Sequence, residues 1–151
     1  MQTKRFQMPM IARILLGAVF TIFGLNGFLG FMPQPALPDA AGSFMGALAA
    51  TGYMFPLIKG TEVLAGLLLL GNRLVPLALV LLAPITVNIV AFHLFLAPGA
   101  AGMLMPLFIV ALELVLAWHY REVFRPLFQG TRREAQASKP ARAAMTPQRA
   151  T

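Results

Sequence analysis

The sequence predicts an all-α polytopic membrane protein: four transmembrane helices in an antiparallel bundle, with a short interfacial helix between spans one and two. Of 151 residues, 58% are hydrophobic and 11% are charged, whereas a typical soluble domain has about 25% charged residues. A chain this short has too much surface to bury so many apolar side chains in a globule. The apolar residues also fall into long runs, separated by prolines, glycines and charges, as in a multi-span membrane protein.

The expected membrane domain covers residues 1–128, and its spans are residues 11–31, 53–70, 74–97 and 103–120. The first run follows Lys4 and Arg5, as the apolar region of a signal peptide does. Residues 28–31 (FLGF) are a poor small-residue cleavage site, so the run is interpreted as an uncleaved anchor. Within it, Gly17 and Thr21 form a pair of small residues four apart, which allows another helix to approach closely.

The segment between spans one and two contains three prolines, Pro33, Pro35 and Pro38, which are incompatible with a regular helix. Asp39 follows them and can cap a short helix over residues 40–50, because its carboxylate can accept a free N–H of the first turn. The residues of that helix are small and only weakly apolar. We therefore expect it to lie at the membrane interface rather than to span the bilayer.

The second span contains two charged residues, Lys59 and Glu62, three positions apart and therefore on one helical face with Gly66. A central charge costs about 2.5–3.5 kcal/mol on the insertion scale, while each Leu, Ile, Phe or Val contributes only about 0.3–0.6 kcal/mol. The span would insert poorly alone. We expect Lys59 to pair with Glu62 and neighbouring helices to shelter both side chains.

Further polar residues occur in the other spans. Asn26, late in the first span, is either a helix-end residue or part of a site. The third span has an interior proline and, after it, Asn88 and His93, while Glu113 lies near the middle of the fourth span. In a four-span arrangement Asn26, Lys59, Glu62, Asn88 and His93 all lie at mid-depth or in the outer half of the bilayer. Polar side chains at such depths usually face a bundle interior or a cavity.

Charge predicts the orientation and the surroundings of the chain. Every Lys and Arg except Lys59 falls on one side of the four-span arrangement, which places both termini in the cytoplasm by the positive-inside rule. The net charge of +7 therefore favours anionic membrane lipids over nucleic acid as a partner. Residues 129–151 are basic, with almost nothing to bury, and are expected to form a disordered cytoplasmic tail.

Five short stretches resemble a known family. They are residues 13–17 (RILLG), 23–26 (FGLN), 52–53 (GY), 62–70 (EVLAGLLLL) and 84–93 (PITVNIVAFH). In this order they resemble the DoxX-like family of small bacterial inner-membrane proteins, over about residues 11–128. The resemblance implies a four-helix bundle and, from some relatives, a link to membrane oxidoreductase complexes. That fold is similar to the vitamin K epoxide reductase bundle, whose chemistry needs cysteines, and this chain has none.

The sequence has no Gly-rich phosphate loop, no Ser/His/Asp arrangement and no nucleotide fingerprint. No catalytic or metal site is expected, and the chain alone does not look like a complete enzyme. Three hypotheses remain. The first is a subunit or partner of a membrane oxidoreductase that binds a small lipophilic ligand, such as a quinone, at Asn26, Lys59, Glu62, Asn88 and His93.

Whether the site binds a ligand or is only structural, Glu62, Asn88 and His93 are expected to form one hydrogen-bonded cluster in the outer half of the bundle, with Lys59 and Asn26 at its edge. The second hypothesis is a structural or assembly partner of another protein, in which the polar groups only hold the bundle together. The third is a small transporter or proton path that uses Glu62, His93 and Glu113.

Overall fold

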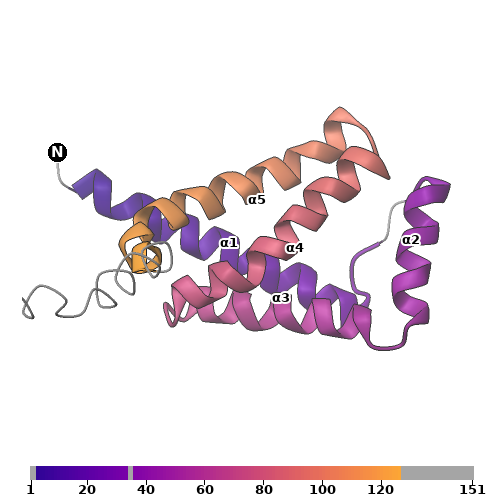
Figure 1. The fold of residues 1–151 in the computed structure, drawn as a ribbon, viewed down its shortest axis with the longest axis horizontal. Coiled ribbons are helices and arrows are strands. Elements are labelled where there is room, and N and C mark those ends of the chain that lie inside the picture. The colour runs from indigo at the N-terminus through magenta and orange to yellow at the C-terminus, as the bar shows by residue number, and fades with distance from the viewer. Residues whose placement is uncertain (1–2, 34–35, 127–151) are drawn as a thin grey trace, which may run out of the picture. The chain divides into compact units, whose positions relative to one another are not determined.

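The computed structural model describes residues 3–33 and 36–126. Five α-helices make up most of this part of the chain (Figure 1): α1 (Thr3–Leu29), α2 (Asp39–Ala50), α3 (Met54–Leu70), α4 (Val75–Phe95) and α5 (Ala100–His119). The chain divides into two compact units, residues 1–119 and residues 120–151. All five helices belong to the first unit. Of the second, residues 120–126 are described, and 121–126 are helical; the expected disordered tail, residues 129–151, lies outside the described residues.

Most ends of the helices lie within a few residues of the expected span ends. Of the four expected spans, three are long and apolar enough to cross a membrane by themselves. α4, α5 and residues 7–29 of α1 are each long and apolar enough to cross a membrane. α3 has 17 residues, which at 1.5 Å per residue extend about 25 Å, less than the roughly 30 Å of a bilayer core. It contributes a fourth span only if α2 and α3, bent by 92°, count as one. The protein is thus all-helical, with the three or four apolar helices of a multi-pass membrane protein.

The first span begins earlier than expected. α1 starts at Thr3, whereas the apolar run that defined the expected span starts at residue 11. The residues in between include Lys, Arg, Gln and Met, which are good helix formers, so the helix continues outward beyond the apolar segment. Hydropathy locates the apolar part of a helix and not its end.

α1 and α3 pack antiparallel along a face of small residues. A Cβ atom added to Gly17 would lie 3.0 Å from the Gly66 carbonyl oxygen, and one added to Gly24 would lie 3.0 Å from the Val63 amide nitrogen. Later residues of α1 therefore contact earlier residues of α3, as in an antiparallel pair. Gly66 in turn lies against Thr21 and Gly17. The predicted close helix approach at Gly17 and Thr21 is confirmed, with Gly66 as the partner.

A tight turn joins α3 to α4, as expected from residues 71–73. The Asn72 amide donates to the Leu69 carbonyl at 3.1 Å, and the Arg73 amide donates to the Leu68 carbonyl at 2.9 Å. These two hydrogen bonds form a Schellman motif, whose C′ residue adopts the left-handed conformation. Asn72 fills that place with φ of 52°, because asparagine tolerates this region better than most residues.

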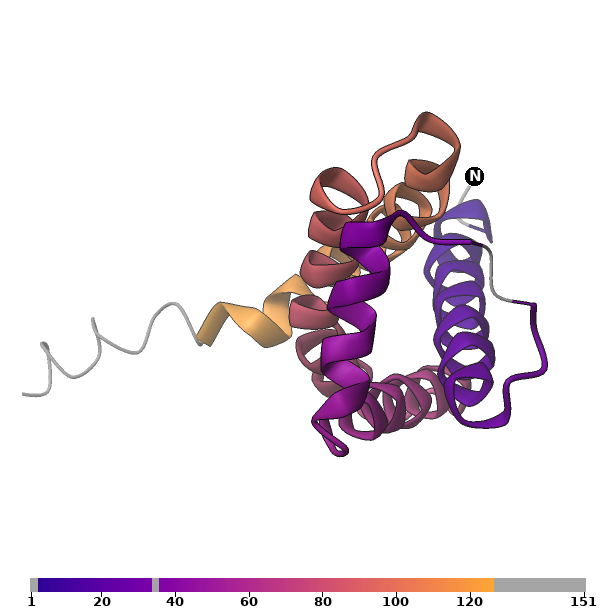
Figure 2. The same ribbon diagram turned by 90° about the vertical axis from the view of Figure 1, so that its right-hand side faces the viewer.

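α2 lies across the ends of α3 and α4, as Figure 2 shows from that side. The Phe44 and Phe92 rings are 6.0 Å apart between centroids, and Ala41 is fully buried. The helix occurs where the sequence predicted it, but the capping role of Asp39 is wrong. Pro38 occupies the N-cap without a side-chain hydrogen bond, and Asp39 is the first helical residue, where its charge favours the helix dipole.

Many large apolar side chains point outward from the helices. Phe95 is 79% exposed and Leu104 is 70% exposed. The buried core is small and consists mainly of aliphatic residues facing the neighbouring helices: Ala12, Leu16, Phe20, Ala65, Leu69, Val75, Ala78, Leu79, Leu82, Ile109 and Leu116. In a lipid environment, apolar side chains can face outward, and helices associate through close packing along narrow interfaces. The distribution of exposed and buried residues fits that environment.

Candidate functional site

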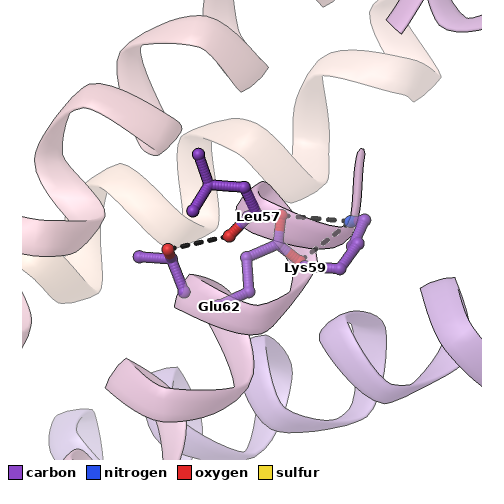
Figure 3. A network of polar contacts seen from close by, with 4 residues as sticks. Leu57, Lys59 and Glu62 are labelled. Atoms are coloured by element: carbon purple, nitrogen blue, oxygen red, sulfur yellow. Dashed lines mark hydrogen bonds and ion pairs between the residues drawn. The ribbon is translucent and has the colours of Figure 1, made fainter. Parts of the chain in front are cut away.

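The most deeply buried charge in the described residues is the carboxylate of Glu62 on α3. Its residue is 3% exposed, and its two oxygens accept hydrogen bonds from the Lys59 ammonium group at 3.0 and 2.8 Å (Figure 3). The predicted Lys59–Glu62 pair is confirmed. It forms inside one helix because residues three apart share a face. The Lys59 nitrogen also lies 5.9 Å from the centroid of the Phe55 ring, within reach of a cation–π interaction.

Two glycines of α1 make room for this pair. A Cβ on Gly27 would come within 2.6 Å of the Lys59 Cδ atom, and a Cβ on Gly24 would lie 3.1 Å from the Glu62 Cβ atom. The stems of both charged side chains therefore rest directly on the α1 backbone. Sequence reasoning did not connect these glycines with the ion pair. Their spacing of three, on the face that also carries Gly17, was the available signal.

Asn26 acts as a helix-end residue in the structure. It is buried, and its side-chain oxygen accepts a hydrogen bond from the Met32 amide at 2.7 Å. Its backbone carbonyl accepts a bond from Gly30 at 2.8 Å, and Gly30 takes the left-handed conformation that ends α1. Asn26 thus holds the exit of α1, and it makes no bond to Lys59 or Glu62.

His93 and Asn88, both on α4, are not joined to the ion pair. The Nδ1 atom of His93 lies 2.8 Å from the Ile89 carbonyl of its own helix, and its ring packs edge-on against Phe92. Asn88 is exposed on α4. The expected hydrogen-bonded cluster of Glu62, Asn88 and His93 is therefore wrong. Each of these groups is satisfied within its own helix or faces outward.

Arg13 has a structural role that sequence reasoning missed. Its guanidinium group, on α1, donates hydrogen bonds to the carbonyls of Leu69 and Leu70, the latter at 3.0 Å. These are carbonyls of the last turn of α3, where the helix offers no i+4 amide; the Leu69 carbonyl also accepts from the Asn72 amide of the turn. A cation at a helix C-terminus also interacts favourably with the helix dipole. The signal in the sequence was a single arginine inside an apolar run.

The fold and these contacts define a class: an all-helical, membrane-type protein with a buried ion pair in a helix too short to span alone. Among the described residues no three His, Asp or Glu side chains gather where they could hold a metal ion. Comparisons of the chain with protein-family models, curated proteins and solved structures find no significant match.

Proposed function

We propose that this chain is a DoxX-like protein of the bacterial inner membrane and a subunit or partner of a membrane oxidoreductase. In this proposal it binds a small lipophilic ligand, such as a quinone, beside Lys59 and Glu62, with Asn88 and His93 contributed by α4. The observation that carries the proposal is the buried Lys59–Glu62 pair within apolar helices. Ionisable residues among membrane helices are costly and usually mark a functional site.

The polar groups retain hydrogen-bonding capacity that suits a ligand carbonyl. Lys59 has three N–H donors, of which Glu62 takes two. The Asn88 amide makes no hydrogen bond within residues 3–33 and 36–126. A backbone carbonyl only accepts, so the His93 Nδ1–H group donates to Ile89, and the Nε2 atom makes no hydrogen bond within the described residues. Lys59 and Asn88 can therefore donate to carbonyl oxygens, while Glu62 can take up or supply a proton.

The proposal includes an orientation with both termini in the cytoplasm. Support comes from Arg13, whose contacts with Leu69 and Leu70 bring it next to the turn that carries Arg73. Two of the basic residues that define the orientation thus lie at one end of the first unit. A C-terminal fusion should be active with a cytoplasmic reporter and inactive with a periplasmic one, and the reverse pattern would contradict the orientation.

Asn88→Ala is the most informative variant for the ligand site. Asn88 is exposed and makes no hydrogen bond within the described part of the chain, so its removal should leave stability within about 0.5 kcal/mol. Full-length protein would be purified gently, and its lipophilic small molecules measured by mass spectrometry. We expect quinone per protein to fall by about tenfold, which corresponds to 1.4 kcal/mol of binding free energy.

Val87→Ala is the matched control, since Val87 is an exposed neighbour on α4. It should keep the quinone content of the unmodified protein. Glu62→Gln is the second site variant, with Glu122→Gln, at an exposed carboxylate, as its control. Equal quinone content in the site variants and the controls, or no quinone in any sample, would contradict ligand binding.

A structural or assembly role is the second candidate, and a specific observation favours it. Asn26, Arg13 and Lys59 all form their hydrogen bonds inside the chain, as expected of groups that only hold helices together. In that case Asn88→Ala should be silent, while a partner protein remains bound through purification. Co-purification of such a partner, together with tolerance of the site variants, would favour this role over ligand binding.

A further inference from the structure

A second carboxylate, Glu113, lies on a different helix from the Lys59–Glu62 pair. It belongs to α5 and shares a stripe with Ile109 and Leu116, which are both buried. Residues at i, i+4 and i+7 lie on one helical face, so Glu113 occupies an inward-facing position and is itself half-buried. α5 is one of the helices long and apolar enough to cross a membrane.

The Glu113 carboxyl group lies near Thr86 on α4. Thr86 is 4% exposed and continues the buried stripe of Leu79 and Leu82. Its hydroxyl has no hydrogen-bond partner among the described residues, and Glu113 is the neighbouring carboxyl group on α5. Thr21 is the other buried hydroxyl without a partner among the described residues, but it lies against Gly66. Within the described residues, Thr86 is the buried hydroxyl without a partner that lies near a carboxyl group.

No described cation forms an ion pair with Glu113. α5 packs against α4 and α1. On α4 the imidazole of His93 is bonded to the Ile89 carbonyl, and on α1 the guanidinium of Arg13 is bonded to carbonyls of α3. His119, six residues along α5, is rotated by about 120° from Glu113 on an ideal helix. Glu113 therefore differs from Glu62, whose charge is balanced by Lys59.

An ionised carboxylate without a partner is very unfavourable in an apolar environment, and such a group usually becomes neutral by taking a proton. We propose that Glu113 and Thr86 form a proton-binding site between α4 and α5, distinct from the ligand site of the proposed function. Glu113 keeps one proton as the neutral acid, and this acid O–H donates a hydrogen bond to the Thr86 hydroxyl oxygen. A hydroxyl can accept and donate at once, so this arrangement satisfies both groups.

A lipophilic carbodiimide tests the protonation state directly. The acid O–H adds across one C=N bond of the reagent: the carboxyl oxygen bonds to carbon, and the proton passes to nitrogen. The O-acylisourea then rearranges to a stable N-acylurea without a leaving group. An ionised carboxylate lacks the proton for this addition. Dicyclohexylcarbodiimide should therefore modify Glu113 and leave Glu62 unmodified in the full-length protein.

The modified residue would be identified by peptide mass spectrometry in detergent over a range of pH. The rate at Glu113 should fall by about tenfold per pH unit once the carboxyl group begins to ionise. Lys59→Met is the positive control for access, because it removes the cation and should make Glu62 reactive. Modification of Glu62 in that variant without modification of Glu113 would overturn the proposal, as would equal rates at Glu113 and the exposed Glu122.

Infrared spectroscopy gives a second measurement that does not depend on reagent access or on the folding of Lys59→Met. The carbonyl stretching band of a protonated carboxylic acid should be present in the unmodified protein. It should be lost in Glu113→Gln and retained in Glu62→Gln. Loss of the band in Glu62→Gln with its retention in Glu113→Gln would place the proton on the wrong residue and end the proposal.

Discussion

The interface between α1 and α3 differs from the interface between α4 and α5. At the first, Gly17 and Gly66 bring the two backbones together, and Lys59 and Glu62 balance each other against the glycines of α1. At the second, Thr86 is buried without a hydrogen-bond partner and lies near Glu113, which has no cationic partner among the described residues.

The two interfaces therefore accommodate a carboxyl group in different ways. In lipid, helices associate through close packing and interhelical hydrogen bonds rather than through the hydrophobic effect. The α1–α3 interface uses both, since small residues allow contact and Arg13 bonds across to the end of α3. At the α4–α5 interface, the Thr86 hydroxyl has no hydrogen-bond partner and Glu113 has no ion pair within the described residues. Stability should therefore be concentrated in the first interface.

The largest expected effect comes from Lys59→Met, which leaves Glu62 buried without its cation. Breaking a buried pair by removing one partner costs about 3–5 kcal/mol. We expect about 3 kcal/mol, at the lower end of that range, because Glu62 can take a proton. Thermal unfolding in detergent measures the loss. Arg125→Met, which breaks the exposed pair with Glu122, is the control, with an expected loss below about 1 kcal/mol. Equal losses in the two variants would show that burial of the pair does not matter.

Gly66→Ala should destabilise by about 2 kcal/mol, within the range for overpacking. The added Cβ would lie 2.7 Å from the Thr21 amide nitrogen and 2.9 Å from the Gly17 carbonyl oxygen, so backbone must move. Gly60→Ala is the matched control on the same helix, where a Cβ meets nothing within 4 Å. That change should stabilise by about 0.5–1 kcal/mol, because alanine favours a helix over glycine. Melting shifts of the same sign in both variants would be evidence against the close approach of α1 and α3.

Arg13→Gln should cost about 1.5 kcal/mol, the lower value for hydrogen bonds that involve a charged group. The α3 carbonyls of Leu69 and Leu70 lose their donor from α1. Arg73→Gln removes a positive charge from the neighbouring turn, but its side chain has no hydrogen bond in the described residues, so stability should change by less than about 0.5 kcal/mol. If Arg73→Gln lowers the melting temperature as much as Arg13→Gln, charge rather than bonding to α3 explains the effect.

Glu113→Gln should have the smallest effect, within about 0.5 kcal/mol. Glutamine has the shape of the neutral acid and can still donate to Thr86, and the described residues form no ion pair with Glu113 that could be lost. The same melting assay compares it with Lys59→Met, so that the two interfaces are tested side by side. A loss of several kcal/mol for Glu113→Gln would show that Glu113 is ionised and paired, so that the two interfaces do not differ in this respect.

The positions of the helices and their local contacts could be predicted from the sequence. Apolar runs separated by prolines and glycines located α2, α3, α4 and α5 within a few residues, because such signals act along the chain. The Lys59–Glu62 pair followed from a spacing of three, and the role of Gly17 and Thr21 followed from their size. These features need no knowledge of where the other helices lie.

The inward-facing side of each helix, and the contacts between residues far apart in sequence, depend on how the helices pack together. α4 is apolar on all sides, so no stripe in its sequence indicates its rotation, and Asn88 faces outward where a buried position was expected. Arg13 reaches carbonyls 56 and 57 residues away, and any carbonyl at a helix end can accept such a bond. The rotation of each helix and the contacts between distant residues result from packing between helix surfaces. The spacing of residues along one helix does not predict them.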